Sequence, residues 1–152
     1  MLSNKQNDNL SVVGQNVQKK DAVDKVLGKA QFAADLFRPN MLYAGVLRSK
    51  VPAGLINRLD ITKAKAIPGV ECVLTYKDIP GLNATGIIVK DEPILIEDKI
   101  RRIGDAIAIV AAETPALVTE ALQAIEVDWE ETEAILTIDR AKEEDAPKIH
   151  GD

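Results

Sequence analysis

The sequence predicts an α+β domain in which one main helix packs on a mixed or antiparallel sheet. Short apolar runs fill most of the chain, with only brief helical segments between them. Residues 107–112 carry no polar side chain, as in a strand buried on both faces. One good helical pattern comes late, between Pro115 and Ile125. A run of strands followed by a helix fits α+β better than a regular βαβ repeat.

The stretch from Asp91 to Glu130 is predicted to form the centre of the core. Residues 94–96 and 107–112 are apolar runs that indicate strands, and Thr114-Pro115 begins a helix because threonine caps it and proline suits its first position. The apolar stripe of this helix consists of Leu117, Val118, Ala121, Leu122 and Ile125. Val127 and Trp129 alternate with acidic residues, as in a strand buried on one face. We expect this last strand to return beside the strand at 107–112.

The other predicted elements are shorter. They are a strand or extended segment at 31–36, strands at 41–47, 55–61 and 70–75, a helix at 62–67 and a helical turn at 137–142. Thr62 is predicted to cap the helix that Pro68-Gly69 ends. Val70, Cys72 and Leu74 are expected to share one face of their strand, with Cys72 as a small core residue.

The length of 152 residues fits one domain, with residues 1–11 as a disordered lead-in and residues 12–152 as the folded part. The apolar fraction of 46% provides a core, whereas the net charge of −5 disfavours nucleic acid and anionic membrane surfaces as partners. No apolar run is long enough to span a bilayer, and the first residues lack the apolar region of a secretory signal. A cytoplasmic protein is therefore expected.

The residues alone predict no catalytic, cofactor-binding or metal-binding site. One cysteine, Cys72, and one histidine, His150, are too few for a closed zinc site. Asp91-Glu92 is the candidate pair for acid–base chemistry, but adjacent carboxylates before Pro93 also fit a solvated turn.

A set of segments, taken in order, resembles one protein family. The segments are residues 23–36 (VDKVLGKAQFAADL), 41–44 (MLYA), 47–49 (LRS), 66–70 (AIPGV), 78–81 (DIPG), 91–95 (DEPIL), 99–104 (KIRRIG), Ala111 with Glu113-Thr114, Ala121-Leu122 and 125–127 (IEV). This set resembles the N-terminal α/β-hammerhead domain of the molybdenum-binding subunit of the xanthine dehydrogenase and aldehyde oxidase family. The resemblance covers residues 12–152. The sequence departs from the family pattern at two places. After Arg48-Ser49 it has the run Lys50–Gly54 where the family often has proline and histidine, and it has Asp105 where glutamate or glutamine is usual.

The resemblance implies a parent enzyme that hydroxylates a purine, an N-heterocycle or an aldehyde with oxygen from water. It implies molybdopterin with molybdenum in the parent, and iron–sulfur clusters and FAD on other domains or subunits, with none of these cofactors bound by this chain. It also implies that the chain packs on a molybdopterin-binding domain of the same chain or a neighbouring subunit, and that the isolated 152 residues are inactive. In the family, the segment that corresponds to Ile87 and Ile88 approaches the substrate entrance. The resemblance therefore makes Ile87 and Ile88 the candidates for lining the substrate funnel.

Two alternatives remain open at this level. The chain is then either a stand-alone small-ligand-binding or assembly module without enzyme activity, or a self-sufficient hydrolase that uses Asp91-Glu92. The substrate of the parent enzyme is not specified by these residues.

Overall fold

The computed structural model describes residues 12–150 of a chain that divides into two compact units, residues 1–39 and 40–152. The predicted lead-in at 1–11 lies outside the described residues. Helix α1 (Ala22–Val26) and the 3-10 turn η1 (Ala33–Asp35) form the regular structure described in the first unit. The prediction of a strand or extended segment at 31–36 is wrong at its centre, because the Asp35 carboxylate accepts from the Phe32 N–H at 2.9 Å and closes a turn.

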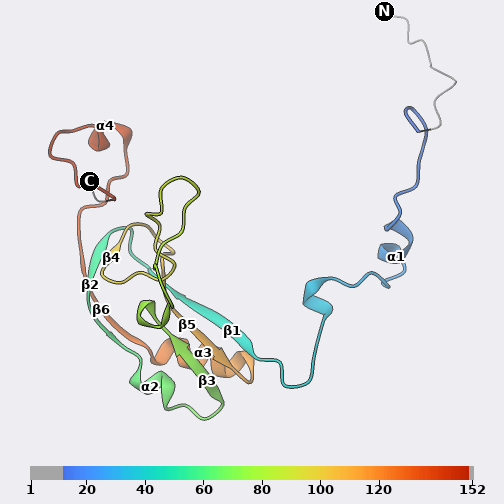
Figure 1. Ribbon diagram of the computed structural model, residues 1–152, viewed down its shortest axis with the longest axis horizontal. Coiled ribbons are helices and arrows are strands. Elements are labelled where there is room, and N and C mark those ends of the chain that lie inside the picture. The colour runs from blue at the N-terminus through green and yellow to red at the C-terminus, as the bar shows by residue number, and fades with distance from the viewer. Residues whose placement is uncertain (1–11, 151–152) are drawn as a thin grey trace, which may run out of the picture. The chain divides into compact units, whose positions relative to one another are not determined.

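The second unit contains two antiparallel sheets of three strands each (Figure 1). The first sheet has the order β1 (Tyr43–Arg48), β5 (Ala106–Ala112), β3 (Val70–Leu74). The second sheet has the order β4 (Lys99–Ile100), β2 (Gly54–Asp60), β6 (Glu126–Glu131). The helical elements are α2 (Thr62–Lys65), η2 (Tyr76–Asp78), α3 (Pro115–Ala124) and α4 (Ile138–Ala141). The predicted α+β class is confirmed, and all strand pairs in these two sheets are antiparallel.

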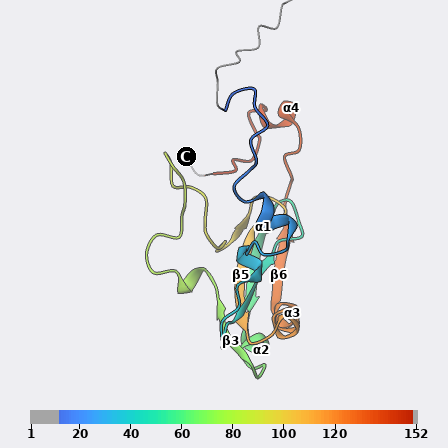
Figure 2. The same cartoon turned by 90° about the vertical axis from the view of Figure 1, so that its right-hand side faces the viewer.

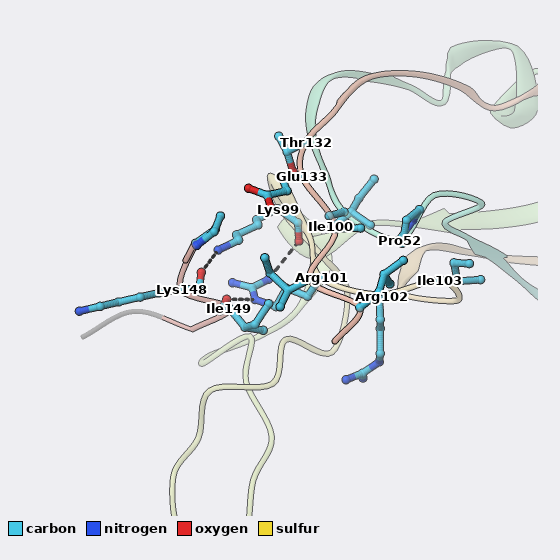
Figure 3. Close-up of a pocket in the computed structure, with 15 residues that line it drawn as sticks. Pro52, Lys99, Ile100, Arg101, Arg102, Ile103, Thr132, Glu133, Lys148 and Ile149 are labelled. Carbon is cyan, nitrogen blue, oxygen red and sulfur yellow. Dashed lines mark hydrogen bonds between the residues drawn. The ribbon is translucent and has the colours of Figure 1, made fainter. Parts of the chain in front are cut away.

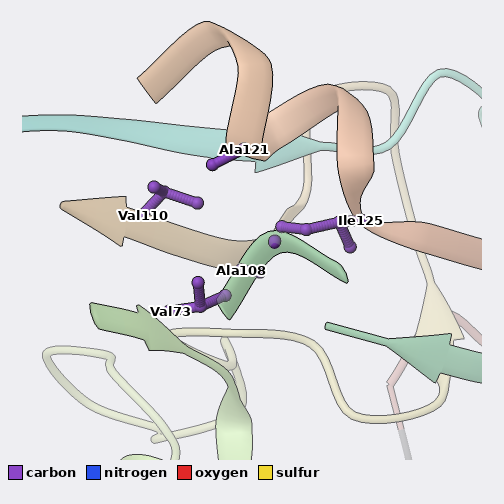
Figure 4. Packing of buried hydrophobic residues seen from close by; sticks show 6 residues of the cluster. Val73, Ala108, Val110, Ala121 and Ile125 are labelled. Carbon is purple, nitrogen blue, oxygen red and sulfur yellow. The ribbon is translucent and has the colours of Figure 1, made fainter. Parts of the chain in front are cut away.

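Helix α3 covers one face of the first sheet, as its apolar stripe predicts. The Thr114 hydroxyl accepts from the Leu117 N–H at 3.2 Å, and Pro115 occupies the first turn. Figure 4 shows Ala121 and Ile125 above Val110, Ala108 and Val73, which are all buried. The helix lies so close to β1 that a Cβ on Gly45 would approach a methyl group of Val118 to 2.5 Å.

A second buried cluster lies next to this one and joins the two sheets. It contains Val51, Ile96, Ile100 and Ile107, with Ile107 fully buried on β5. Three half-buried side chains, those of Leu47, Leu59 and Val127, pack against both clusters. The core is therefore continuous from α3 to the strand pair β2 and β4.

The opposite face of the first sheet is covered only at one end. Alternation places Ile107, Ile109 and Ala111 of β5 on this face, away from α3. Ile107 is buried by the second cluster, but Ile109 and Ala111 are only half-buried. The prediction that residues 107–112 form a strand buried on both faces thus holds for one face and for only one end of the other.

Several local predictions differ from the structure. Residues 94–96 form no strand, although Leu95 and Ile96 are buried. The Asn83 side chain binds the backbone of Ile94 and Leu95 in place of a neighbouring strand. The strand after α3 does not return beside β5 but crosses to the second sheet, where β6 pairs with β2. Cys72 is half-buried and is not a core residue. A register irregularity between Val70 and Cys72 leaves Val70 packed on the core and turns Cys72 and Leu74 to the uncovered face.

The start of α2 also differs from its prediction. Thr62 is the first helical residue rather than the cap, and no side chain caps the helix in the usual position. Instead a carboxylate oxygen of Asp60 accepts from the Thr62 N–H at 2.9 Å, and the other accepts from Arg58 at 2.6 Å. These bonds to the charged form, led by that from the Thr62 backbone, lower the pKa of Asp60 from 3.8 to about 2.

Replacing Asp60 with asparagine is expected to make the chain less sensitive to acid. Because the folded pKa of Asp60 lies below its unfolded value, the carboxylate stabilises the fold above pH 3.8, and this contribution is lost as the pH falls through about 2. The measurement is the free energy of unfolding of wild type and Asp60→Asn across that window. The difference in free energy of unfolding between the two proteins should become smaller as the pH falls. A difference independent of pH would contradict the lowered pKa of Asp60.

Candidate functional site

The long connection between β3 and β4 forms a projecting hairpin whose base is held by a single asparagine. The Asn83 amide donates to the Leu95 carbonyl at 2.6 Å, and its oxygen accepts from the Ile94 and Leu95 N–H groups at 3.1 and 3.2 Å. Thr85 and Glu92 then pair through two backbone hydrogen bonds. Figures 1 and 2 both show this hairpin extending away from the strands of the sheets. The hairpin is therefore anchored at its base and open at its tip.

The tip of the hairpin presents the predicted funnel candidates to solvent. Ile87 is 104% and Ile88 93% exposed, and Val89 is 64% exposed. Gly86 has φ +149°, and a Cβ there would lie 1.8 Å from the Val89 carbonyl oxygen, so this turn requires glycine. The tip thus carries three consecutive exposed aliphatic side chains on a turn that requires glycine at position 86.

Both carboxylates of the acidic pair at the base of the hairpin have side-chain neighbours. Arg102 binds Glu92 in a bidentate fork, with nitrogen–oxygen distances of 2.6 and 2.8 Å. Hydrogen bonds from this guanidinium lower the pKa of Glu92 below its usual value and raise that of Arg102. Asp91 lies beside His150, with Nδ1 3.5 Å from a carboxylate oxygen. The Glu92 carboxylate, held ionised by Arg102, is a weak general base, so the geometry does not favour the hydrolytic alternative.

The side chain of Asp105 is buried, and its carboxylate binds the backbone of its own turn. One of its carboxylate oxygens accepts from the backbone N–H groups of Arg101 and Arg102, at 2.7 and 3.2 Å. Its backbone carbonyl accepts from the Ser49 N–H at 2.8 Å, and its side chain is 7% exposed. Because Asp105 binds Arg102, it also helps to position the Arg102 guanidinium that binds Glu92. The departure from the family pattern at Asp105 therefore bears on the architecture of the turn.

An apolar hollow of about 420 Å³ is lined by part of this turn and by three other segments of the chain. Its walls include Pro52, Ile100, Ile103, Leu136 and Ile149, and the C-terminal stretch crosses it (Figure 3). Periodicity gives no signal for the hollow, because its segments lie far apart in the sequence.

Polar groups of the hollow are used to fasten the C-terminal stretch. Lys99 Nζ donates to the Lys148 carbonyl at 2.5 Å, and Arg101 Nε donates to the Ile149 carbonyl at 3.2 Å. The Glu133 carboxylate is bound by Arg140, whose hydrogen bonds lower the pKa of Glu133. Since these charged side chains are already engaged, the hollow is suited to apolar groups.

The described residues do not fit a molybdenum–pterin group. Among residues 12–150 no three His, Cys, Asp or Glu side chains come together to hold a metal ion. The Lys99 and Arg101 side chains at the hollow donate to backbone carbonyls of the chain, and no glycine-rich phosphate loop lines it. No chemical step through that cofactor is therefore derived from these residues. Within the same range no helix has the length and hydropathy that crossing a bilayer requires.

Comparison with known proteins gives one family. The family model for the a/b hammerhead domain of aldehyde oxidase and xanthine dehydrogenase matches residues 27–133. The chain is 60% identical over 141 residues to the nicotinate dehydrogenase large molybdopterin subunit of Eubacterium barkeri, covering 93% of this chain and 33% of that protein. It is 42% identical over 134 residues to a probable xanthine dehydrogenase subunit of Bacillus subtilis, covering 88% of this chain and 18% of that protein.

Solved structures agree with the sequence matches. The aldehyde oxidoreductase of Desulfovibrio desulfuricans superposes with a TM-score of 0.82 at 35% identity, over 88% of this chain and 16% of that one. The CO dehydrogenase of Oligotropha carboxidovorans also gives 0.82, at 28% identity, over 88% of this chain and 17% of that one. The chain therefore spans about a third of the Eubacterium barkeri subunit and about a sixth of these enzymes.

The expected fold and the expected family are both confirmed by these matches. The family model covers most of the chain, and its identity with relatives extends over nearly all of it. This chain belongs to the a/b hammerhead domain family of the aldehyde oxidases and xanthine dehydrogenases.

Proposed function

We propose that this chain is the non-catalytic hammerhead domain of a molybdenum hydroxylase, and that it packs on the molybdopterin-binding part of that enzyme. The observation that carries the proposal is the 60% identity to a large molybdopterin subunit over 93% of this chain. Glu92 held in its ion pair with Arg102 and the apolar hollow are consistent with a domain that shapes access and leaves the chemistry to its partner.

The parent reaction that we propose is hydroxylation of a carbon in an N-heterocycle, with oxygen from water. Among the substrates open to the family, the name of the 60% identical relative favours nicotinate over purines and aldehydes. Molybdopterin with molybdenum would be bound outside this chain, with iron–sulfur clusters and FAD on other domains or subunits. We also propose a cytoplasmic enzyme and residues 12–152 as one functional domain.

Within that enzyme we propose that Ile87 and Ile88 border the substrate entrance. Both side chains are fully exposed on a turn whose base is fixed by Asn83 and by the Thr85–Glu92 pair. The anchored base fixes where the hairpin leaves the sheets, so that its apolar tip can reach a partner beyond them (Figure 1). An apolar tip exposed in this way favours association, which a partner that covers part of the tip would satisfy.

The test is a chimera in which this chain replaces the matched third of the Eubacterium barkeri subunit, expressed with the companion subunits of that enzyme. The chimera should contain molybdenum and hydroxylate nicotinate, whereas the free 152-residue chain should do neither. The double variant Ile87→Ala/Ile88→Ala should lower kcat/KM for nicotinate by about tenfold and leave the molybdenum content unchanged. The control is Ile138→Ala, a 73% exposed isoleucine on α4.

Four outcomes would contradict these proposals. A free chain that binds molybdopterin, or a folded chimera without molybdenum, would exclude the role as a hammerhead domain. A double variant with the kinetics of the Ile138→Ala control would exclude the two isoleucines from the entrance. A ligand-induced rise in Tm of the free chain would instead favour the stand-alone binding module.

A further inference from the structure

The uncovered face of the first sheet consists of six apolar side chains in two cross-strand rows. One row contains Val46, Ile109 and Leu74, which are direct neighbours on β1, β5 and β3. The next row contains Ala44, Ala111 and Cys72, again directly paired across the three strands. We call these six residues the outer face. The first row has the larger side chains and the second the smaller ones, so an apolar helix or strand laid across the sheet could pack between the larger side chains.

The outer face is open to solvent along both edges. Val46 is 37% and Leu74 39% exposed, and Ala44 on β1 is exposed as well. The opposite face of the same strands is sealed by α3, with Val73, Ala108 and Val110 at 1% exposure or less. No side chain of the outer face carries a charge, so removing this face from water is favourable.

The composition of β5 is the reason to assign a partner to this face. A strand of a one-sided sheet alternates apolar and polar side chains, because polar groups on the wet face cost nothing and aid solubility. β5 reads Ala-Ile-Ala-Ile-Val-Ala-Ala and contains no polar side chain on either face. β6, whose burial alternates, shows the contrast with Glu126, Asp128 and Glu130. β5 therefore has the sequence of a strand covered on both sides.

We infer that the outer face docks onto an apolar layer of the molybdopterin-binding part of the parent subunit. This inference rests on the proposed function and adds the surface through which the two parts meet. Two thirds of the Eubacterium barkeri subunit lie beyond the matched segment and are available to cover the face. Six small and medium side chains fall well short of the roughly 800 Å² per partner that a stable association between free proteins buries. A covalently attached partner needs less area, because its effective concentration is high.

A second copy of the chain is the competing occupant, and the area argument disfavours it. The chemistry also excludes a charged or strongly polar partner surface, whose groups would be left without hydrogen bonds against this face. The partner layer must therefore present aliphatic or aromatic side chains without intervening charges.

The single cysteine of the chain lies on the outer face and provides the test. The rate of alkylation by iodoacetamide is measured at Cys72 and at Val46→Cys, by mass spectrometry of the corresponding peptides, in the free chain and in the chimera. Both rates should fall by about tenfold or more in the chimera, since thiol reactivity depends on access. The matched control is Leu55→Cys, a 43% exposed position on β2 of the other sheet, whose rate should change by less than about twofold.

A second set of variants tests the energetics of the same contact. Val46→Lys/Leu74→Lys places charges on two exposed edge-strand positions, which free proteins tolerate. The free double variant should keep the Tm of the wild-type chain, whereas the chimera that carries it should lose most of its molybdenum-loaded subunit. Leu55→Lys serves as the control and should leave that yield unchanged.

The outcomes separate the inference from the proposed function. If the wild-type chimera holds molybdenum but the alkylation rates at Cys72 and Val46→Cys equal those of the free chain, the outer face is not the docking surface, and the proposed function stands. If the folded chimera holds no molybdenum, the proposed function fails and takes this inference with it. Protection in the free chain that grows with its own concentration would assign the face to a second copy and overturn the inference.

Discussion

Ile107→Ala is expected to lower the free energy of unfolding of the chain by about 4 kcal/mol. Ile107 is fully buried on β5 and packs with Val51, Ile96 and Ile100 in the second cluster. Neighbours from separate segments surround the side chain, so the space left by its removal cannot close by a shift of one element. Denaturant unfolding followed by circular dichroism measures the change. The m-value should stay constant.

The control for Ile107→Ala is Ile103→Ala, a short distance before it in the sequence. Ile103 is 67% exposed, and its truncation should change the free energy of unfolding by less than about 0.5 kcal/mol. Equal effects of the two substitutions would show that the packing of Ile107 in the second cluster does not hold the two sheets together.

Asp105→Ala is expected to cost about 3 kcal/mol, because it removes the acceptor of two backbone N–H groups inside a tight turn. The lost bonds are those from Arg101 and Arg102, at 2.7 and 3.2 Å. The Arg102 side chain loses a partner 3.3 Å away as well, which loosens its fork on Glu92. Hydrogen exchange at the Arg101 and Arg102 amides should become faster, together with that at the Thr85–Glu92 pair.

Asp105→Asn is the matched variant, since its amide oxygen can still accept while its charge is absent. It should retain more than half of the stability that Asp105→Ala loses. If asparagine and alanine destabilise equally, the charge on Asp105, rather than its acceptor geometry, holds the turn.

Some parts of the fold follow from short stretches of sequence. The helix from Thr114 onward was predictable because its cap, its proline and its stripe are local signals that agree with one another, and the structure confirms all three. The strands at 41–47, 55–61 and 70–75 were predictable to within a few residues for the same reason. The tip at Ile87 and Ile88 was found only through family resemblance, and its role stays a proposal.

Other parts have no local signal. Asn83 replaces a strand partner for residues 94–95 with one side chain, and no periodic pattern encodes that substitution. The apolar hollow joins segments 52–53, 99–103, 132–136 and 147–149, which meet only after the sheets have formed. The pairing of Arg102 with Glu92 and the burial of Asp105 likewise depend on the turn that brings them together.

By itself the sequence determined the α+β class, the main helix, most strand positions and the family, because propensity, capping and the order of motifs are properties of neighbouring residues. Only the tertiary structure decided that the strands form two antiparallel sheets, that β6 pairs with β2 rather than β5, and that Cys72 points away from the core. Strand partners and bulges are settled by packing between distant segments, and a one-residue change of register reverses which face each side chain occupies. Packing between distant segments also decides which faces are covered. It leaves one apolar face of β5 open in this chain, where the sequence alone predicted a strand buried on both faces.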